Sequence, residues 1–487
     1  MSNYRSTKLI AVGFLSLALS AGCGSTDPVV APGDPTCDAA KITPGDFCGS
    51  LLSSTFAAAD AASFSKATEF GTASGKTATF GVKEYRVRYK TQVDAASTVI
   101  DATGVILLPD GVAPTGGFPI LMWGHGTVGM ADTAAPSINP SANMEVSIRN
   151  YAARGFIVIA PDYAGLGVAD VPHYYLVKKP TAYSIIDAVR SGITFAKAQG
   201  LSVSKSTVFV GHSQGGEAVL FADEIYKNES YGAADFDLKG VVALAPAPIW
   251  KYALWAAVAY NQSLGSFASS YLYSASKYNT ALDLTKALSA ASITAITANA
   301  ETKTTVEMAQ AAIFPTTYAT FLSSFFATSV LVDYSALTKD TVPYGYIYGV
   351  AHGEAVTTTL NKFDTVWSGS GVDSAWADEM DKDSPILGLA SSTVPIRLVQ
   401  GFDDATVTRT MTLLMYLKAF ALGNSLEDAD GAAMGASGIT AEFANISPAA
   451  TATCAADTKI IVCGKGHADI PFSFDKYASW VFAKAGL

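Results

Sequence analysis

Residues 211–216 contain the residue types that nucleophilic catalysis needs. They read Gly-His-Ser-Gln-Gly-Gly and place Ser213 in a Gly-x-Ser-x-Gly pattern. A β-rich run, 207–210, precedes the serine and a helix-patterned run, 216–226, follows it, so Ser213 stands at a strand-to-helix turn. A turn this sharp crowds the backbone, which explains the glycines two residues to either side. We therefore predict that Ser213 is a nucleophile; without the strand and the helix, the motif would be only a glycine-rich turn.

A serine hydroxyl needs a neighbouring base, and histidine supplies it most often. The chain has 5 histidines: His125, His173, His212, His352 and His467. Behind a serine turn of this kind, the order along the chain is serine, acid and then histidine. His467, close to the C-terminus, fits this order and is the predicted base. His352 also follows Ser213, but it lies in a long insertion, where a structural role is favoured.

The acid that orients the histidine is expected in the loop after the predicted strand 395–400. Residues 401–407 read Gly-Phe-Asp-Asp-Ala-Thr-Val, so two carboxylates stand there, Asp403 and Asp404. In sheets with such a serine turn, this loop usually reads Gly-x-x-Asp-x-x-Val, which selects Asp404. Asp403 would then be a turn or helix-capping residue. We predict that Asp404, with Asp403 as the alternative, holds the imidazole and stabilises its charged form.

Two backbone N–H groups are expected to stabilise the negative oxygen that develops when a serine attacks a carbonyl group. The N–H of Gln214 is one candidate, because the N-terminus of the following helix presents unpaired N–H groups and a positive dipole end. The loop after the apolar run 118–123 reads Gly-His-Gly-Thr, and its glycines let the backbone approach a substrate. The N–H of Thr127 in this loop is the second candidate.

These residues need a sheet to position them, and the sequence from residue 80 onward predicts one. Short apolar runs, as in strands buried on both faces, alternate with helix-patterned segments. The expected strands are 83–90, 103–108, 118–123, 156–160, 207–210 and 240–245, and the expected helices are 143–153, 183–198 and 216–226. This alternation predicts an α/β fold with a mostly parallel central sheet and helices on both faces. Ser213 would lie above the carboxyl edge of the sheet, where open α/β sheets bind ligands.

The alternation stops at Pro246. Residues 248–392 precede the next buried strand, and they are rich in Ala, Ser, Thr and aromatic side chains with helical patterning. Since a structureless loop of that length is uncommon in a compact domain, we predict an inserted, mainly helical cap. It divides an α/β core into a first part, 76–247, and a second part, 393–487. In the second part we expect a helix at 408–421, a last strand at 440–446 or 459–462, and a closing helix at 474–485.

Three segments carry a resemblance to a known family. Residues 160–167 read Ala-Pro-Asp-Tyr-Ala-Gly-Leu-Gly, residues 187–190 read Asp-Ala-Val-Arg on the next helix, and residues 211–216 complete the series. With this series and the acid and histidine loops, the chain resembles the secretory lipases of the lipase A-like group, which are α/β-hydrolases. The resemblance implies hydrolysis of carboxylic esters and a helical cap between the sixth and seventh strands, with acyl chains bound beneath it.

Five other polar residues in or beside these motifs are interpreted as structural. His125 and His212 are expected to pack beside the serine turn rather than carry protons. Asp162 follows a strand and would pin the next turn. Asp187 and Arg190 stand three residues apart on a helix, where opposite charges pair along one face.

The N-terminus predicts export. Arg5 and Lys8 precede an apolar run, 9–19, which is too short for an ordinary membrane span but suits a signal peptide. The run ends in Leu-Ser-Ala-Gly-Cys, which resembles a bacterial lipoprotein processing site and makes Cys23 the predicted lipidated residue. Residues 1–22 would be the signal peptide, and 23–75 a lipidated tether and N-terminal segment. We expect an outer-membrane or cell-surface anchor; a plain secreted or periplasmic protein is the alternative.

Of the 5 cysteines, four remain if Cys23 carries lipid, and they form two pairs that are local in the sequence. We predict the bridges Cys37–Cys48 and Cys454–Cys463, the most local of three connectivities, as fits an exported chain. Metal ligation is the alternative, but no histidine stands at ligand spacing near either pair. The prediction includes no metal and no other cofactor.

The composition limits the choice of partners. Charged residues make up 15% of the chain, and the net charge is −10 without any basic stripe, which argues against nucleic acid. We expect a monomer that acts on a small-molecule ester or lipid. Two other functions stay open. One is a serine peptidase, because a catalytic triad does not choose between ester and amide, and the other is an inert surface protein that uses the fold for binding.

Overall fold

The computed structural model describes residues 35–247, 262–294, 374–385, 394–434 and 457–487, with short gaps inside several of these ranges. Several predictions concern residues outside this description: the signal peptide 1–22, Cys23, His352, Cys454 and the alternative strand 440–446. Most of the expected helix 408–421 also lies outside it. Within the described ranges, no helix is long and apolar enough to cross a membrane.

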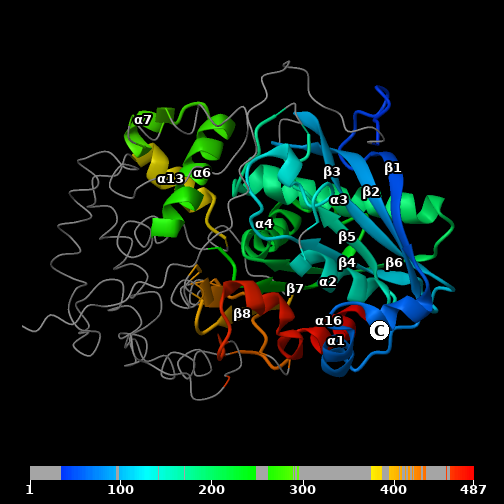
Figure 1. Ribbon diagram of the computed structural model, residues 1–487. Helices are drawn as coiled ribbons and strands as arrows, with labels where there is room; N and C mark the ends of the chain where they lie inside the picture. Colours follow the sequence, from blue (N-terminus) through cyan, green and yellow to red (C-terminus); the bar gives the residue numbers. More distant parts are fainter. Residues whose placement is uncertain are drawn as a thin grey trace, which may run out of the picture. The chain divides into compact units, whose positions relative to one another are not determined.

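One sheet with strand order β1-β2-β3-β5-β4-β6-β7-β8-β9 organises the described residues (Figure 1). The strands are β1 (Phe47–Phe56), β2 (Gly81–Gln92), β3 (Val99–Asp110), β4 (Phe118–Gly124), β5 (Ile157–Pro161), β6 (Val203–His212), β7 (Asp237–Leu244), β8 (Ile396–Gly401) and β9 (Ile461–Val462). The pairings from β1 through β2 and β3 to β5 are antiparallel, and those from β5 through β4, β6, β7 and β8 to β9 are parallel. The predicted α/β fold with a mostly parallel sheet is confirmed.

Helices cover both faces of the sheet, as Figure 1 shows. They are α1 (Ala67–Ser74), α2 (Ala142–Ala152), α3 (Lys178–Ala198), α4 (Gln214–Glu229) and α16 (Ala478–Ala485). Strand β4 explains why both faces must be covered, because successive side chains of a strand point to opposite faces. Phe118, Ile120 and Met122 pack in the apolar cluster that includes α3 and α4, whereas Leu121 and Trp123 pack in the one that includes α1, α2 and α16. Every residue of β4 is buried.

The strand predictions are confirmed for β2 to β8, and of the two candidates for the last strand the structure contains 461–462. Strand β1 and helix α1 were not predicted. Two helices differ at their starts: α3 begins at Lys178 rather than 183, and the predicted closing helix begins as α16 at Ala478. Between His467 and α16 the chain forms two 3-10 helices, η4 (His467–Phe472) and η5 (Phe474–Lys476). The earlier start of α3 has a tertiary cause, since Asp383 Oδ1 accepts a hydrogen bond from Lys178 N at 2.8 Å.

The described part of the predicted cap is helical. It contains α6 (Gln262–Tyr278), α7 (Leu284–Ala287) and α13 (Ser374–Lys382), which follow β7 and precede β8 in the chain. Two hydrogen bonds link the segments, from Trp376 Nε1 to Asp283 O at 2.9 Å and from Asn279 Nδ2 to Glu379 Oε2 at 2.9 Å. Tyr271 of α6 donates to Asp383 Oδ2 at 3.1 Å, so the carboxylate at the start of α3 also binds α6.

Candidate active site

Ser213 forms the turn between β6 and α4 by itself. Its backbone has φ 57° and ψ −118°, a left-handed conformation that is uncommon for a residue with a side chain. The turn is held by hydrogen bonds from Ser213 N to Leu244 O at 2.9 Å and from Glu217 N to Ser213 O at 3.1 Å. Strain of this kind persists where the surroundings over-determine the backbone, and it is common at functional sites.

The glycines around Ser213 allow three backbone segments to touch. A Cβ atom on Gly211 would overlap the carbonyl oxygen of Gly215, and a Cβ atom on Gly215 would overlap that of Gly124 at the end of β4. A Cβ atom on Gly216 would lie 2.8 Å from Pro246 Cα. Glycine is therefore required here by close approach of backbone to backbone, and the approach brings the loop after β4 against the serine turn.

The structure brings Ser213, His467 and Asp404 together, although they lie in three separate loops. His467 Nε2 lies 2.8 Å from Ser213 Oγ, and His467 Nδ1 lies 2.7 Å from Asp404 Oδ2. A carboxylate only accepts hydrogen bonds, so Nδ1 carries the hydrogen and Nε2 is free to accept the one from Ser213. The three side chains form a hydrogen-bonded series from hydroxyl to imidazole to carboxylate.

The carboxylate of Asp404 is buried and accepts hydrogen bonds on both oxygens. Thr406 N and Val407 N donate to Oδ1 at 2.9 and 2.8 Å, and Gln400 Nε2 donates to Oδ2 at 3.0 Å. Asp403, the alternative acid, is exposed, and its backbone N donates to Lys465 O at 3.2 Å. The structure therefore places Asp404, and not Asp403, against the histidine.

His212 supports the histidine loop. Its Nε2 lies 2.9 Å from the backbone oxygen of His467, and the two ring centroids are 4.7 Å apart. Burial, with a smaller effect of the neighbouring His467, lowers the pKa of His212 to about 3. The ring is therefore neutral at ordinary pH and donates its Nε2 hydrogen to the carbonyl group. This position agrees with the packing role expected from the sequence.

The loop after β4 is held by Tyr163. The Tyr163 hydroxyl donates to His125 O at 2.9 Å, and its ring stacks on the His125 ring with centroids 4.3 Å apart. His125 Nδ1 lies 2.7 Å from Gly126 O, and burial lowers the pKa of this histidine. His125 thus folds its own loop, as expected of a structural residue.

The two predicted N–H donors lie on either side of the turn. Gln214 is the first residue of α4 and is buried. Thr127 belongs to the loop after β4 and is partly exposed, with its Oγ1 2.8 Å from the Tyr175 hydroxyl. Gly126 of the same loop approaches the turn, since a Cβ atom there would lie 3.5 Å from Ser213 Cβ.

The charged residues of the family-like motifs are engaged in structural contacts. Asp162 accepts hydrogen bonds from Thr103 Oγ1 at 2.7 Å and from Ser137 N at 2.9 Å. Asp187 binds Arg190 at 2.9 Å, so the predicted pair along one helix face is present. Burial raises the pKa of Asp187 to about 6. The contacts of Asp162 join β3 to the loop after β5, and the pair Asp187–Arg190 lies within α3.

Sequence reasoning assigned no role to Gln400, His173 or Tyr175, which all contact the predicted site residues. Gln400 is a buried amide near the end of β8, after the apolar residues Leu398 and Val399, and that change was a visible signal. His173 Nε2 lies 3.2 Å from Gln214 Nε2, and Tyr175 contacts Thr127 as described above. Nothing in the local pattern around 173–175 indicates these contacts, because their partners are distant in the sequence.

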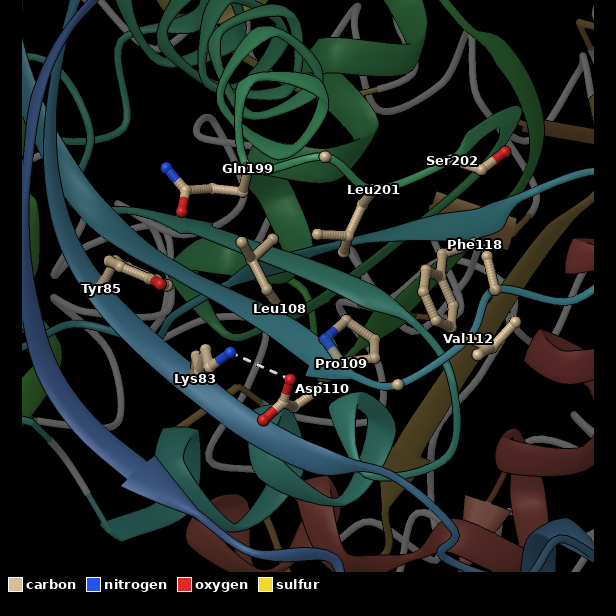
Figure 2. A pocket seen from close by; sticks show the side chains of 13 residues that line it. Lys83, Tyr85, Leu108, Pro109, Asp110, Val112, Phe118, Gln199, Leu201 and Ser202 are labelled. Atoms are coloured by element: carbon tan, nitrogen blue, oxygen red, sulfur yellow. Dashed lines mark hydrogen bonds and ion pairs between the residues drawn. The ribbon is translucent and has the colours of Figure 1, made fainter.

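A pocket of about 500 Å³ lies at the opposite end of the strands (Figure 2). It is lined by residues that include Phe118, the first residue of β4, and Leu201 and Ser202 before β6. Lys83 and Asp110, which also line it, form an ion pair at 2.9 Å. The pocket contains none of the predicted site residues, and we assign it no role.

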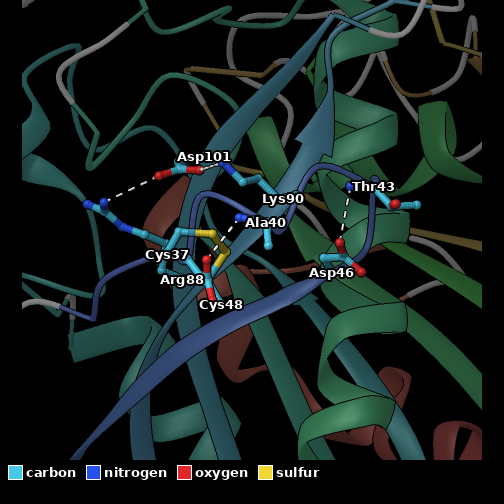
Figure 3. Close-up of a disulfide and its surroundings, with 9 residues drawn as sticks. Cys37, Ala40, Thr43, Asp46, Cys48, Arg88, Lys90 and Asp101 are labelled. Carbon is cyan, nitrogen blue, oxygen red and sulfur yellow. Dashed lines mark hydrogen bonds and ion pairs between the residues drawn. A yellow bond between two sulfur atoms is a disulfide. The ribbon is translucent and has the colours of Figure 1, made fainter.

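The predicted bridge Cys37–Cys48 is present, with a Cα–Cα distance of 4.4 Å (Figure 3). Asp101 lies close enough to the two sulfur atoms for the group to resemble a metal site. The sulfur atoms are bonded to each other, however, so they offer no thiolate to a metal. Cys463 is also disulfide-bonded, and its predicted partner Cys454 lies outside the described residues.

Comparisons with known proteins agree with this geometry. The secretory lipase family model matches residues 141–249, which include Ser213. A presumed hydrolase from Legionella pneumophila is similar in structure, with 15% identity, a TM-score of 0.62 and coverage of 90% of this chain and 98% of that one. A ligand-bound form of the rice cell wall degrading esterase LipA from Xanthomonas oryzae has 18% identity, a TM-score of 0.53 and coverage of 82% and 97%.

No curated protein matches the sequence significantly. The family match covers the serine turn and the helices beside it, and the likeness to solved structures extends over most of the chain at low identity. The family match supports the enzyme class, and the structural likeness shows the fold. The chain has an α/β-hydrolase fold, its residues 141–249 are similar to the secretory lipases, and it is a carboxylic ester hydrolase.

Proposed function

We propose that the protein is an exported serine esterase or lipase that hydrolyses apolar, acylglycerol-like esters through Ser213, His467 and Asp404. The observation that supports this most directly is the hydrogen-bonded series of these residues, with distances of 2.8 and 2.7 Å. They follow β6, β9 and β8, at the carboxyl ends of neighbouring parallel strands, which is where open α/β sheets bind ligands.

The proposed reaction uses each residue for one task. His467 Nε2 accepts the Oγ proton as Ser213 attacks the ester carbon, and the N–H groups of Gln214 and Thr127 stabilise the negative oxygen that forms. His467 then gives the proton to the departing alcohol, which leaves an acyl group on Ser213. Water, deprotonated by His467, releases the acid and restores the serine.

Asp404 stays bound to His467 throughout this cycle. It accepts hydrogen bonds from His467, Gln400, Thr406 and Val407. The same bonds hold the carboxylate in one orientation. Asp404 therefore selects the imidazole tautomer that has its lone pair toward Ser213, and it stabilises the imidazolium that forms during attack.

Replacement of Ser213 tests the reaction. We expect Ser213→Ala to lose essentially all turnover of p-nitrophenyl esters and all labelling by a fluorophosphonate probe. Ser191→Ala, which removes another buried serine hydroxyl, on α3, is the matched control and should keep both. Ester turnover that survives in Ser213→Ala would reject the assignment.

The same assays separate the two alternative functions. A serine peptidase on this fold would cleave p-nitroanilide peptides at least as well as p-nitrophenyl esters. An inert binding protein would neither turn over esters nor react with the fluorophosphonate. We expect ester turnover and labelling, with little amide cleavage.

We also propose that residues 248–392 form a cap over an acyl-binding tunnel. Support comes from the helices α6, α7 and α13 and from their bonds to the core at Lys178 and His173. The first and second parts of the core would then be 76–247 and 393–487. A series of p-nitrophenyl esters from acetate to palmitate tests the tunnel, and activity confined to acetate and butyrate would contradict it.

The location of the protein is a further part of the proposal. Residues 1–22 would be removed as a signal peptide, Cys23 would carry lipid, and residues up to 75 would connect the anchor to the enzyme. The disulfide Cys37–Cys48 supports export, because such bridges form in oxidising compartments. Labelling of cells with an alkyne fatty acid should modify the protein and should fail for Cys23→Ser; a labelled variant would exclude Cys23.

Analytical ultracentrifugation of the form that starts after Cys23 tests the expected monomer.

A further inference from the structure

Residues 173–175, between β5 and α3, contact both of the residues whose N–H groups we propose as oxyanion donors. The side chain of His173 contacts that of Gln214, with 3.2 Å between His173 Nε2 and Gln214 Nε2. The hydroxyl of Tyr175 lies 2.8 Å from Thr127 Oγ1. One short segment therefore contacts both sides of the proposed oxyanion site, although Thr127 and Gln214 belong to separate parts of the chain.

The hydrogen bonds of His173 are compatible with only one form of its ring. Nδ1 lies 3.2 Å from Ala164 O, and a carbonyl oxygen only accepts, so Nδ1 carries the hydrogen. In the neutral ring, Nε2 then accepts a hydrogen bond from the amide nitrogen of Gln214. His173 and Gln214 are each 1% exposed, so the pair is shielded from competing water. The side chain of Gln214 thus has a fixed partner right at the start of α4.

The contact between Tyr175 and Thr127 is similarly protected. Tyr175 is 2% exposed, and burial raises the pKa of its hydroxyl, which therefore stays protonated. Thr127 belongs to a loop that contains glycines and is itself partly exposed. A hydrogen bond to a buried tyrosine restricts such a residue more than it would restrict one inside a strand.

The backbone around 173–175 is held by contacts outside the serine turn. Leu176 has φ 57° in the left-handed region and is buried, so its conformation is imposed by the packing around it. Gly165 has φ 78°, and a Cβ atom there would overlap Pro172 O. Tyr174 N donates to Ala164 O at 3.3 Å and closes the same turn. These contacts set the conformation of residues 173–175 independently of the serine turn.

The same segment also contacts the cap. Ser274 Oγ of α6 donates to His173 O at 2.9 Å, and both residues are buried. Residues 173–175 therefore touch α6, the serine turn and the loop after β4.

We propose that His173 and Tyr175 are positioning residues that set the distance between the N–H groups of Gln214 and Thr127. Two N–H donors stabilise an oxyanion only if both lie at hydrogen-bond distance from the same oxygen atom. A small displacement of either N–H group therefore removes much of the stabilisation. This inference rests on the proposed function, because it concerns the oxyanion site of the same reaction.

The test compares Tyr175→Phe and His173→Asn with the unchanged enzyme. Both variants should lower kcat about 10-fold and leave KM within about 2-fold, because the lost interaction acts on the transition state. The inhibition constant of phenylboronic acid, which forms a tetrahedral adduct on the serine, should rise by the same factor as kcat falls. His173→Gln, whose side-chain oxygen can accept from Gln214, should retain more activity than His173→Asn.

Tyr89→Phe is the matched control. Tyr89 is buried, and its hydroxyl donates to Ser184 O at 2.9 Å, so the variant also loses one buried hydrogen bond. It should lower the melting temperature by an amount similar to Tyr175→Phe and leave kcat and boronic acid affinity unchanged. A Tyr175→Phe enzyme that behaves like Tyr89→Phe would overturn the inference.

The outcomes also separate this inference from the proposed function. If Ser213→Ala keeps ester turnover, the proposed function fails, whatever the positioning variants do. If Ser213→Ala is inactive and Tyr175→Phe and His173→Asn keep full kcat, only the inference fails. Because Tyr175→Phe removes a single oxygen atom, it tests the inference even if His173→Asn does not fold.

Discussion

The two ends of the parallel strands hold polar groups in different ways. At the carboxyl end, Asp404 is buried and accepts hydrogen bonds on both oxygens, and Ser213 is held in a left-handed conformation. At the amino end, the pocket in Figure 2 contains the pair Lys83–Asp110, whose side chains are 40% and 50% exposed. A pocket with an exposed ion pair therefore does not by itself indicate a functional site. Buried polar groups with hydrogen bonds to all their polar atoms, next to strained turns, do indicate one.

A second comparison concerns two buried carboxylates. Asp404 has hydrogen-bond partners on both oxygens. Asp223 on α4 is 0% exposed and has no hydrogen-bond partner on either oxygen among the described residues. Burial raises the pKa of Asp223 to about 7. The protein thus surrounds one buried carboxylate with hydrogen-bond donors and buries another where its charge is disfavoured.

The largest effect should come from the acid at the carboxyl end. Asp404→Asn keeps the shape of the side chain but favours the wrong tautomer of His467, and we expect kcat to fall about 10³- to 10⁴-fold. Asp403→Asn, which changes the exposed neighbour, should leave kcat within about 2-fold. Steady-state ester hydrolysis by both variants checks this, and a loss confined to Asp403→Asn would reverse the assignment.

A smaller effect is expected from the amide that supports this acid. Gln400→Leu removes the hydrogen bond to Asp404 Oδ2 at 3.0 Å, and we expect kcat to fall about 10-fold with KM little changed. The control is Thr412→Val, because Thr412 Oγ1 binds the other end of the same amide, Gln400 Oε1 at 2.5 Å. If both variants have equal kcat, the bond from Gln400 to Asp404 does not contribute to catalysis.

The unpartnered carboxylate should affect stability rather than activity. The pKa of Asp223 is about 7 in the folded protein and near 4 in the unfolded chain. Between about pH 4 and pH 7 the folded protein therefore keeps a proton on Asp223 that the unfolded chain has released. The free energy of unfolding should therefore fall as pH rises from about 4 to 7. Asp223→Asn cannot be charged, so it should not lose stability in this pH range. Its change in the free energy of unfolding should be more favourable at pH 8 than at pH 4, by about 1 to 3 kcal/mol.

Urea unfolding at several pH values measures this difference. Asp237→Asn, which changes an exposed carboxylate on β7, is the control and should show the pH dependence of the unchanged protein. A stability curve of Asp223→Asn parallel to that of the control would mean that Asp223 is charged in the folded protein.

The smallest effect is expected at the amino end. Lys83→Met removes the exposed pair with Asp110, and such pairs contribute about 0 to 1 kcal/mol. Ester hydrolysis should be unchanged, which a p-nitrophenyl butyrate assay checks. A change in kcat larger than about 3-fold would show that the two ends of the sheet are coupled.

Much of the fold followed from local patterns. The apolar runs of β4, β6 and β7 predicted strands because a strand buried on both faces has no polar alternation. The edge strand β1 was missed for the converse reason, since many of its side chains are exposed. It is held instead by pairing with β2 and by the nearby disulfide Cys37–Cys48. The start of α3 at Lys178 was missed because its capping residue, Asp383, is 205 positions away.

The sequence by itself determined the chemistry on offer: a serine in a glycine-rich turn, a carboxylate pair in one loop and a histidine in another, in the required order. These features depend on backbone crowding and on short-range patterns, which a linear sequence records. Only the tertiary structure decided which carboxylate meets His467, which tautomer His173, His212 and His467 adopt and which residues support Gln214 and Thr127. Those choices depend on groups that packing brings within about 3 Å of one another across as many as 255 positions of sequence, and no local pattern encodes such contacts.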